Sequence, residues 1–296
     1  MKALATYIMR GRMQAVLAST AFAVLSLLLP PLSYLSGAVV ALVTLRKGAG
    51  EGLLVAVVSA LVMGLLASLS LGGPLLAVVF AGVVWLPILV LAAILRSTVA
   101  MPLVLLVAAL IAAGAVIAAH AYLGDTVAWW QQVLNTVLGQ AMTQQGLDGG
   151  AVLAGSARMM TALMASAFFL SMVLSVFIAR WWQAMLYNPG GFGTEFKGLR
   201  LGKSGAALGV LVLAWWLVSP GMGSLAADLA AVVLTLFSVP GLALVHDWVS
   251  KTGANLAWLV GLYILLAIAP QLLMILAVLG FADSGLNLRR YIKVKD

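Results

Sequence analysis

Residues 53–95 read LLVAVVSALVMGLLASLSLGGPLLAVVFAGVVWLPILVLAAIL and contain no charged side chain. The stretch holds two long apolar segments, Leu53–Leu71 and Leu75–Leu95. A membrane-spanning helix needs ~20 mostly apolar residues to cross ~30 Å of hydrocarbon, because no water there can pair with an open backbone group. Both segments meet that length, so the stretch predicts two spanning helices joined by a short turn.

The same pattern extends along the whole chain. Hydrophobic residues occupy 64% of the 296 positions and charged residues 8%, which excludes a soluble globular protein. The sequence therefore predicts an all-α, polytopic transmembrane helical bundle of about eight to nine spans. The other expected spans are Pro102–Ala119, Met159–Ala179, Leu225–Val245 and Leu256–Gly280, together with the shorter segments Met13–Leu29, Leu32–Leu45 and Leu208–Val218.

Prolines and basic residues predict how these spans are connected. Proline cannot continue the backbone hydrogen-bond ladder, so Pro30-Pro31 predicts a tight hairpin between two short helices. Short cytoplasmic loops accumulate Lys and Arg, and this rule places the N-terminus inside. The opposite side then carries Arg158, Asp125, Asp148 and Asp228. Eight crossings, which omit Leu208–Val218, would leave both termini inside.

Four regions follow from these spans. We expect an N-terminal six-span bundle over residues 1–183, with an outer amphipathic helix near 125–145. A cytoplasmic basic loop follows at 184–206, then C-terminal helices at 207–282 and a basic tail at 283–296.

The chain lacks the residues that several classes of function require. There is no cysteine, and His120 and His246 lie at expected helix ends without a recognisable metal motif. No paired-carboxylate or Ser/His/Asp constellation is present, so we expect no enzyme, no cofactor and no metal site. The formal net charge of +8 is accounted for by inner-face loops that contact anionic lipid, and it does not indicate nucleic acid.

The expected outer helix has one apolar face and one uncharged polar face. Asp125 or Thr126 can cap its start, and Gly146 with Gly149-Gly150 ends it. One interpretation is a lid over a cavity that touches a polar solute; the other is a helix that rests on the bilayer. The apolar face is Val127, Trp130, Leu134, Val137, Leu138, Ala141 and Met142, and the possible solute contacts are Trp129, Gln132 and Asn135.

The basic loop 184–206 offers a second candidate surface. Lys197, Arg200 and Lys203 repeat every three residues, which places them roughly on one helical face. This face either binds anionic lipid or docks a cytoplasmic or membrane partner. Trp181 and Trp182, just before the loop, are expected to anchor the preceding span at the headgroups.

Two further patterns concern helix packing. Pro240 removes its own N–H and frees the carbonyl of Leu236, so the break offers Ser238 and Pro240 as possible solute contacts or is a purely structural kink. Ala15, Ser19 and Ala23 form a small-xxx-small row that would let another helix, including one of a partner, approach closely.

Five short motifs lie in the second half of the chain: NPGGFG (188–193), LRLG (199–202), GLALVH (241–246), GFAD (280–283) and NLRR (287–290). In these motifs the chain resembles the YybS-like family of bacterial polytopic membrane proteins. The first six spans of that family are similar in arrangement to the S components of energy-coupling-factor transporters and to the cell-shape protein MreD. The resemblance implies a bacterial inner (cytoplasmic) membrane and a cytoplasmic C-terminus, and it supplies no catalytic residues.

Two functions remain open. In the first, the six N-terminal spans bind a small solute under the outer helix, as an S component does, and the Ala15/Ser19/Ala23 row docks an energising partner. In the second, the protein is an MreD-like membrane scaffold that recruits a partner through Lys197, Arg200 and Lys203. The uncharged outer helix favours solute binding.

Overall fold

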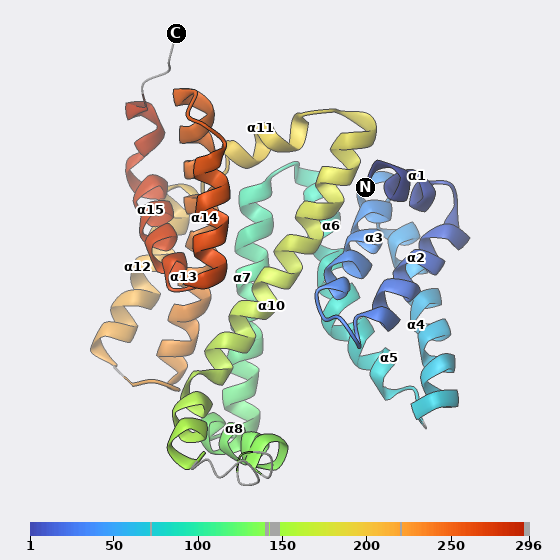
Figure 1. Cartoon of the computed structure of the whole chain (residues 1–296), viewed down its shortest axis with the longest axis horizontal. Coiled ribbons are helices and arrows are strands. Elements are labelled where there is room, and N and C mark those ends of the chain that lie inside the picture. Colours follow the sequence, from blue (N-terminus) through green and yellow to red (C-terminus); the bar gives the residue numbers. More distant parts are fainter. Residues whose placement is uncertain (72, 140–141, 143–148, 220, 293–296) are drawn as a thin grey trace. The chain divides into compact units, whose positions relative to one another are not determined.

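The computed structural model describes residues 1–71, 73–139, 142, 149–219 and 221–292 (Figure 1). Throughout these residues the regular structure is helical and no strand occurs, which confirms the all-α prediction. Five helices are long and apolar enough to cross a membrane, or six if one bent pair is counted as a span. The eight or nine spans expected from the sequence are therefore not reached.

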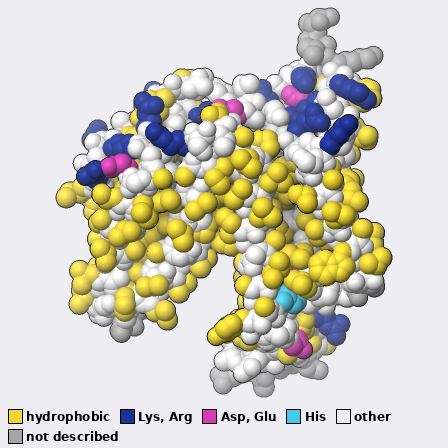
Figure 2. Space-filling model, turned by 180° about the vertical axis from the view of Figure 1, so that it is seen from behind, with side chains coloured by type: hydrophobic (Ala, Val, Ile, Leu, Met, Phe, Trp, Pro, Cys, Tyr) yellow, Lys and Arg dark blue, Asp and Glu magenta, His cyan; other side chains and the backbone are white. Residues whose placement is uncertain are grey.

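The five long helices include most of the segments that the sequence identified. They are α4 (Ala49–Leu71), the continuous stretch α5 (Leu75–Phe80), η1 (Ala81–Trp85) and α6 (Leu86–Thr98), α7 (Met101–Leu123), α10 (Gly150–Tyr187) and α13 (Leu225–Thr252). The bent pair is α11 (Gly191–Lys197) and α12 (Gly202–Val218), which meet at 53°. In Figure 2 hydrophobic side chains cover much of the surface, and most Lys and Arg side chains lie in clusters outside the large hydrophobic areas. The protein is thus a membrane-embedded helical protein.

The chain forms two compact units. Unit 1 contains residues 1–108 and 170–199, and unit 2 contains residues 109–169 and 200–296. The division falls within α7, within α10 and between Leu199 and Arg200, whereas the sequence predicted boundaries at residues 183, 206 and 282.

Unit 1 contains a short helical hairpin, formed by α2 (Arg12–Leu25) and α3 (Leu32–Lys47), which follows α1 (Lys2–Met9). At the start of α2, Arg12 Nε donates to Glu51 Oε2 of α4 at 2.8 Å. At the other end of the hairpin, α3 ends two residues before α4 begins. The start of α2 and the end of α3 therefore both lie beside the start of α4. We call this the basic end of unit 1. The predicted turn at Pro30-Pro31 is confirmed.

The arms of this hairpin are too short to be spans. They contain 14 and 16 residues and rise ~21 and ~24 Å, against ~34 Å for the 23 residues of α4. The two spans expected at Met13–Leu29 and Leu32–Leu45 are therefore replaced by one hairpin that stops short of the far end of α4.

Unit 2 contains a second short hairpin, α14 (Ala257–Ile268) and α15 (Leu272–Leu286), followed by η3 (Leu288–Tyr291) (Figure 1). α14 begins shortly after α13 ends, and His246 of α13 lies 2.9 Å from the Tyr263 hydroxyl of α14. In the last turn of α15, Asp283 pairs with Arg289 and faces Arg200. Arg200 lies just before the start of α12. α12 and α13 are antiparallel neighbours, so the start of α12 lies beside the end of α13. The start of α12, the end of α13, the start of α14 and the end of α15 therefore lie together, and we call them the basic end of unit 2.

The single span expected at Leu256–Gly280 is wrong, because this segment forms two helices. Proline at position 270 has no N–H, and Ala269 is non-helical at φ −130°, ψ 79°, so the helix stops and the chain reverses. The arms contain 12 and 15 residues and rise ~18 and ~23 Å. The turn Ala269–Gln271, which we call the hairpin tip, therefore lies beside the middle of α13.

Candidate functional site

One face of α13 carries polar side chains through the interior of unit 2. Asp228, Ala231 and Thr235 are spaced by three and four residues, so they lie along one side of the helix. Asp228 meets His120 of α7, and Thr235 meets Ser166 of α10. We call this row the polar face of α13.

The hairpin tip lies next to the part of this face that carries Ala231 and Thr235. A groove of about 410 Å³ is lined there by Ser166, Ala231, Leu234, Thr235, Pro270, Gln271, Leu273 and Met274. Thr235 Oγ1 lies 3.0 Å from Ser166 Oγ and 2.8 Å from the carbonyl oxygen of Ala231. We call this space the tip groove.

Gln271 adds an adaptable polar group to the tip groove. It is the N-cap residue of α15, yet its side chain makes no capping hydrogen bond, and it is exposed. An amide side chain has two donor hydrogens and an accepting oxygen. Three uncharged polar side chains from α10, α13 and the tip thus converge on one groove beside a broken helix, a feature typical of solute sites in membrane proteins.

The outer part of the polar face holds a buried pair of ionisable groups. His120 Nε2 lies 2.8 Å from Asp228 Oδ2, and the side chains are 16% and 1% exposed. Asp228 is in the first part of α13, where the helix dipole favours a carboxylate, and Ser224 caps the same end by accepting from Ala227 N at 3.2 Å. Asp228 Oδ1 is buried and has no hydrogen-bond partner among the described residues.

Sequence reasoning missed this pair. It placed Asp228 on the outer side of the membrane and treated His120 as an ordinary helix-end residue. The signal was present, because Asp228 falls inside the expected span Leu225–Val245 and an ionisable residue there marks a functional site by default. What the sequence lacked was the contact between α7 and α13, which brings together two residues 108 positions apart.

The outer helix is only partly as expected. α8 (Thr126–Leu134) is capped by Asp125, whose side chain accepts from Ala128 N at 2.9 Å, and it continues as the π-helix η2 (Asn135–Gly139). Trp130 Nε1 donates to Thr161 Oγ1 of α10 at 3.1 Å, which ties α8 to unit 2. The remainder of the expected helix, including Gln140, Ala141, Thr143 and Gly146, lies outside the described residues.

The side chains expected to touch a solute from this helix do not line the tip groove. Trp129, Gln132 and Asn135 are all at least partly exposed. The structure therefore does not bring them together with the polar groups of α13.

The other two expected solute contacts lie in a closed helix interface. Ser238 and Pro240 are buried in α13, which continues as one helix through the proline. A Cβ atom at Gly280 would lie 2.0 Å from the Phe237 carbonyl oxygen and 3.1 Å from Pro240, so the backbones of α13 and α15 touch here. The proline therefore lies where α15 packs against the backbone of α13, and not beside the tip groove.

The small-residue row of α2 is also used inside the fold. Ala15, Ser19 and Ala23 are at most 1% exposed. Ser36 Oγ of α3 donates to the Ser19 carbonyl at 2.8 Å and accepts from Trp85 Nε1 at 3.0 Å. The row packs the hairpin of unit 1 and presents no surface to a partner.

The basic row of the loop is not a single face. Lys197 ends α11, Arg200 lies between the helices and Lys203 belongs to α12. The Arg200 Nε atom lies 3.9 Å from Asp283 Oδ2, so this cation faces a buried carboxylate of unit 2. The anchor expectation also fails in part: Trp181 is 39% exposed, but Trp182 is fully buried.

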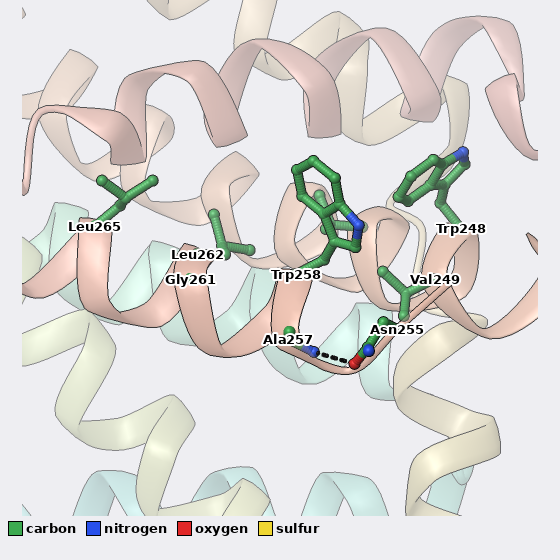
Figure 3. A pocket seen from close by; sticks show the side chains of 9 residues that line it. Trp248, Val249, Asn255, Ala257, Trp258, Gly261, Leu262 and Leu265 are labelled. Atoms are coloured by element: carbon green, nitrogen blue, oxygen red, sulfur yellow. Dashed lines mark hydrogen bonds between the residues drawn. The ribbon is translucent and has the colours of Figure 1, made fainter. Parts of the chain in front are cut away.

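A second groove has a largely apolar lining. The groove in Figure 3, of about 490 Å³, lies between the end of α13 and α14 and is bordered by Trp248 and Trp258. Its amide, Asn255, already accepts from Ala257 N at 2.9 Å, and Trp258 is 67% exposed. This position is typical of indoles at a membrane interface.

The chain was compared with protein-family models, with curated proteins and with solved structures, and none of the three comparisons gives a match. In the described part of the chain, no three or more His, Cys, Asp or Glu residues gather as metal ligands.

Proposed function

We propose that the protein binds a small polar solute in the tip groove of unit 2, as part of a transport-type function in a bacterial inner membrane. The single observation behind this proposal is the meeting of Ser166, Thr235 and Gln271 at the break between α14 and α15. Polar groups are expensive in a membrane interior, and a broken helix is tolerated where it borders a cavity. The groove supplies uncharged donors and acceptors, which suit a neutral or weakly charged solute.

The proposal includes an orientation. Six crossings, formed by α4, α5–α6, α7, α10, the bent pair α11–α12 and α13, are an even number, and in this proposal the two short hairpins do not cross. An even number leaves both termini on one side, and the concentration of Lys and Arg at the basic ends favours the cytoplasm for that side. Anionic lipid is the expected contact of these residues.

The site differs from the one that the S-component resemblance would suggest. That resemblance concerns the first six spans, whereas the tip groove is formed largely by α13 and the C-terminal hairpin. The alternative of a scaffold finds less support, because Arg200, one of the three residues expected to dock its partner, faces Asp283.

Native mass spectrometry of the protein extracted in lipid nanodiscs from its own host tests the proposal. We expect a small molecule at near-stoichiometric occupancy in the wild type and a roughly tenfold loss of affinity in Thr235→Val combined with Ser166→Ala, since each hydrogen bond contributes about 0.5–1.5 kcal/mol. No bound molecule in the wild type, or equal occupancy in the variant, would contradict it.

The chain offers a matched control on the same helix. Thr252 of α13 also donates to the carbonyl four residues earlier, at 2.8 Å from Trp248 O, but within the described residues its hydroxyl has no partner on another helix. Thr252→Val should keep full occupancy. A loss in this control would show that the threonine hydroxyl acts on helix stability and not on the solute.

A further inference from the structure

The unpaired oxygen of Asp228 calls for an explanation. The residue is completely buried, His120 contacts only Oδ2, and Oδ1 has no hydrogen-bond partner in the described part of the chain. A buried carboxylate with an unsatisfied oxygen is strongly unfavourable unless it is neutralised by a counter-charge or by a proton. Asp283, the other fully buried carboxylate in the described part of unit 2, is different because Arg289 and Arg200 both face it.

The charged groups around Asp228 are few. From α7 it meets His120; α8 contributes Asp125, which is occupied as the helix cap; and α10 contributes Arg158, which is exposed. The turn before α13 has no charged residue, and Gly223 there packs against Val127 and the Arg158 backbone. Within the described residues, His120 is therefore the one ionisable partner of Asp228.

His120 connects the buried carboxyl to the surface. It lies in the last turn of α7, and its side chain remains 16% exposed while that of Asp228 is 1% exposed. A neutral imidazole carries a proton on one nitrogen and accepts on the other, so the ring can take up a proton at Nδ1 while it gives one from Nε2. The ring then ends neutral, in its other tautomer, and the carboxyl has gained one proton at Oδ2.

We propose that Asp228 and His120 form a proton-binding site, in which Asp228 takes up a single proton through the imidazole of His120. The site lies two helical turns from Thr235 on the polar face of α13, ~10 Å along the axis. If the tip groove holds a solute, which rests on the proposed function, protonation of Asp228 and occupancy of the groove are linked through this face. A linked proton would supply the driving force for moving the solute.

Infrared difference spectroscopy of the protein in nanodiscs, between about pH 5 and pH 8, tests the proton site without any solute. We expect a protonated-carboxyl C=O band that titrates in the wild type and in Asp125→Asn, and that is missing from Asp228→Asn. A wild type without a titrating carboxyl band, or an Asp228→Asn protein that keeps it, would overturn the proposal.

A second variant covers the case in which Asp228→Asn does not fold. His120→Gln keeps a side-chain donor for Asp228 but cannot relay a proton. The carboxyl band should shift in frequency, and its response to a rapid pH jump should slow about tenfold or more, since the imidazole is the relay. An unchanged band with an unchanged rate would remove both residues from the site.

The link to the tip groove has its own readout. Native mass spectrometry at the two pH values should show occupancy that changes with pH in the wild type and is constant in Asp228→Asn. Occupancy that changes equally in both proteins would refute the link. Absence of any bound molecule at either pH would refute the solute proposal, while the infrared titration would still decide the proton site.

Discussion

The two short hairpins have similar lengths, but the polar side chains of one are closed in packing and those of the other line a groove. In unit 1, α2 and α3 close on each other through Ser19, Ser36 and Trp85, and every one of these side chains is buried. In unit 2, the tip of α14 and α15 opens on a groove with Thr235 half-buried and Gln271 exposed.

The polar side chains of the first hairpin serve packing, whereas those at the tip of the second can serve binding. The hydroxyl and indole groups of unit 1 satisfy each other, so they stabilise the hairpin and leave nothing to bind a ligand. The polar groups at the tip of unit 2 keep donors and acceptors available. A broken helix alone therefore does not identify a site; polar groups that line a groove beside the break do.

The largest effect is expected where the second hairpin is fixed at its basic end. Arg289 Nε donates to Asp283 Oδ2 at 2.8 Å, and the two side chains are 9% and 0% exposed. Asp283→Ala leaves a buried cation without its counter-charge, so the free energy of unfolding should fall by about 3–5 kcal/mol. Denaturant titration in mixed micelles, followed by tryptophan fluorescence, measures the change.

Asp247→Ala is the control for that variant. Asp247 pairs with Lys251 one turn away at 2.8 Å, and the lysine side chain is 35% exposed. The Asp247 side chain is 12% exposed, but Lys251 can be hydrated once the carboxylate is removed, so the loss should be clearly smaller than that of Asp283→Ala. Equal losses in the two variants would mean that Asp283 is no special anchor for α15.

The next effect concerns a close backbone contact between α13 and α15 in unit 2. In Gly280→Ala the new Cβ atom would lie 2.0 Å from Phe237 O and 2.6 Å from Gly241 N, so α13 and α15 must separate. We expect a loss of about 1–3 kcal/mol in the free energy of unfolding. In unit 1, Gly37→Ala should be milder, because the nearest atom, 2.3 Å away, is the flexible end of Ile88.

Gly261→Ala in α14 controls for helix propensity. No described atom lies within 4 Å of the position that its new methyl group would take, so the variant should be neutral or stabilising by up to about 1 kcal/mol. If Gly261→Ala and Gly280→Ala lowered the unfolding midpoint equally, close packing of α13 on α15 would not be the reason.

A paired substitution tests the difference between the two polar interiors. Ser36→Ala removes the acceptor of the buried Trp85 Nε1, so the free energy of unfolding should fall by about 1–3 kcal/mol. Thr235→Val, at a half-buried site, should lower it by at most about 1 kcal/mol and act instead on ligand occupancy. Unfolding titrations and native mass spectra of both proteins give the two readouts, and a reversed pattern would undo the comparison.

The sequence predicted the helical class and the first hairpin because those features are local. An apolar run of sufficient length specifies a helix, and two successive prolines specify a turn. The second hairpin was not recognised, because a single proline at position 270 in a long apolar segment fits both a kinked span and a reversal. Only packing beside α13 decides between them.

The candidate site depends on contacts that a sequence does not contain. Ser166, Thr235 and Gln271 are unremarkable in isolation, and they become a groove only when three helices meet. The row Ala15/Ser19/Ala23 shows the opposite error: the spacing correctly indicated a close helix contact, but the neighbour is α3 of the same chain. Pattern identifies a face, whereas tertiary structure decides what covers it.

The smallest effect is expected at the basic end of unit 1. The Arg12 and Glu51 side chains are 61% and 28% exposed, so solvent and salt screen their attraction. Glu51→Gln should leave the unfolding midpoint unchanged at low and at high salt, in contrast to Asp283→Ala. The reason is that the α2–α3 hairpin is held along its length by Ser19, Ser36 and Trp85 and does not depend on its open end. A salt-dependent loss as large as that of Asp283→Ala would show that both hairpins are fixed at their basic ends, and the contrast between their interiors would then not explain their stability.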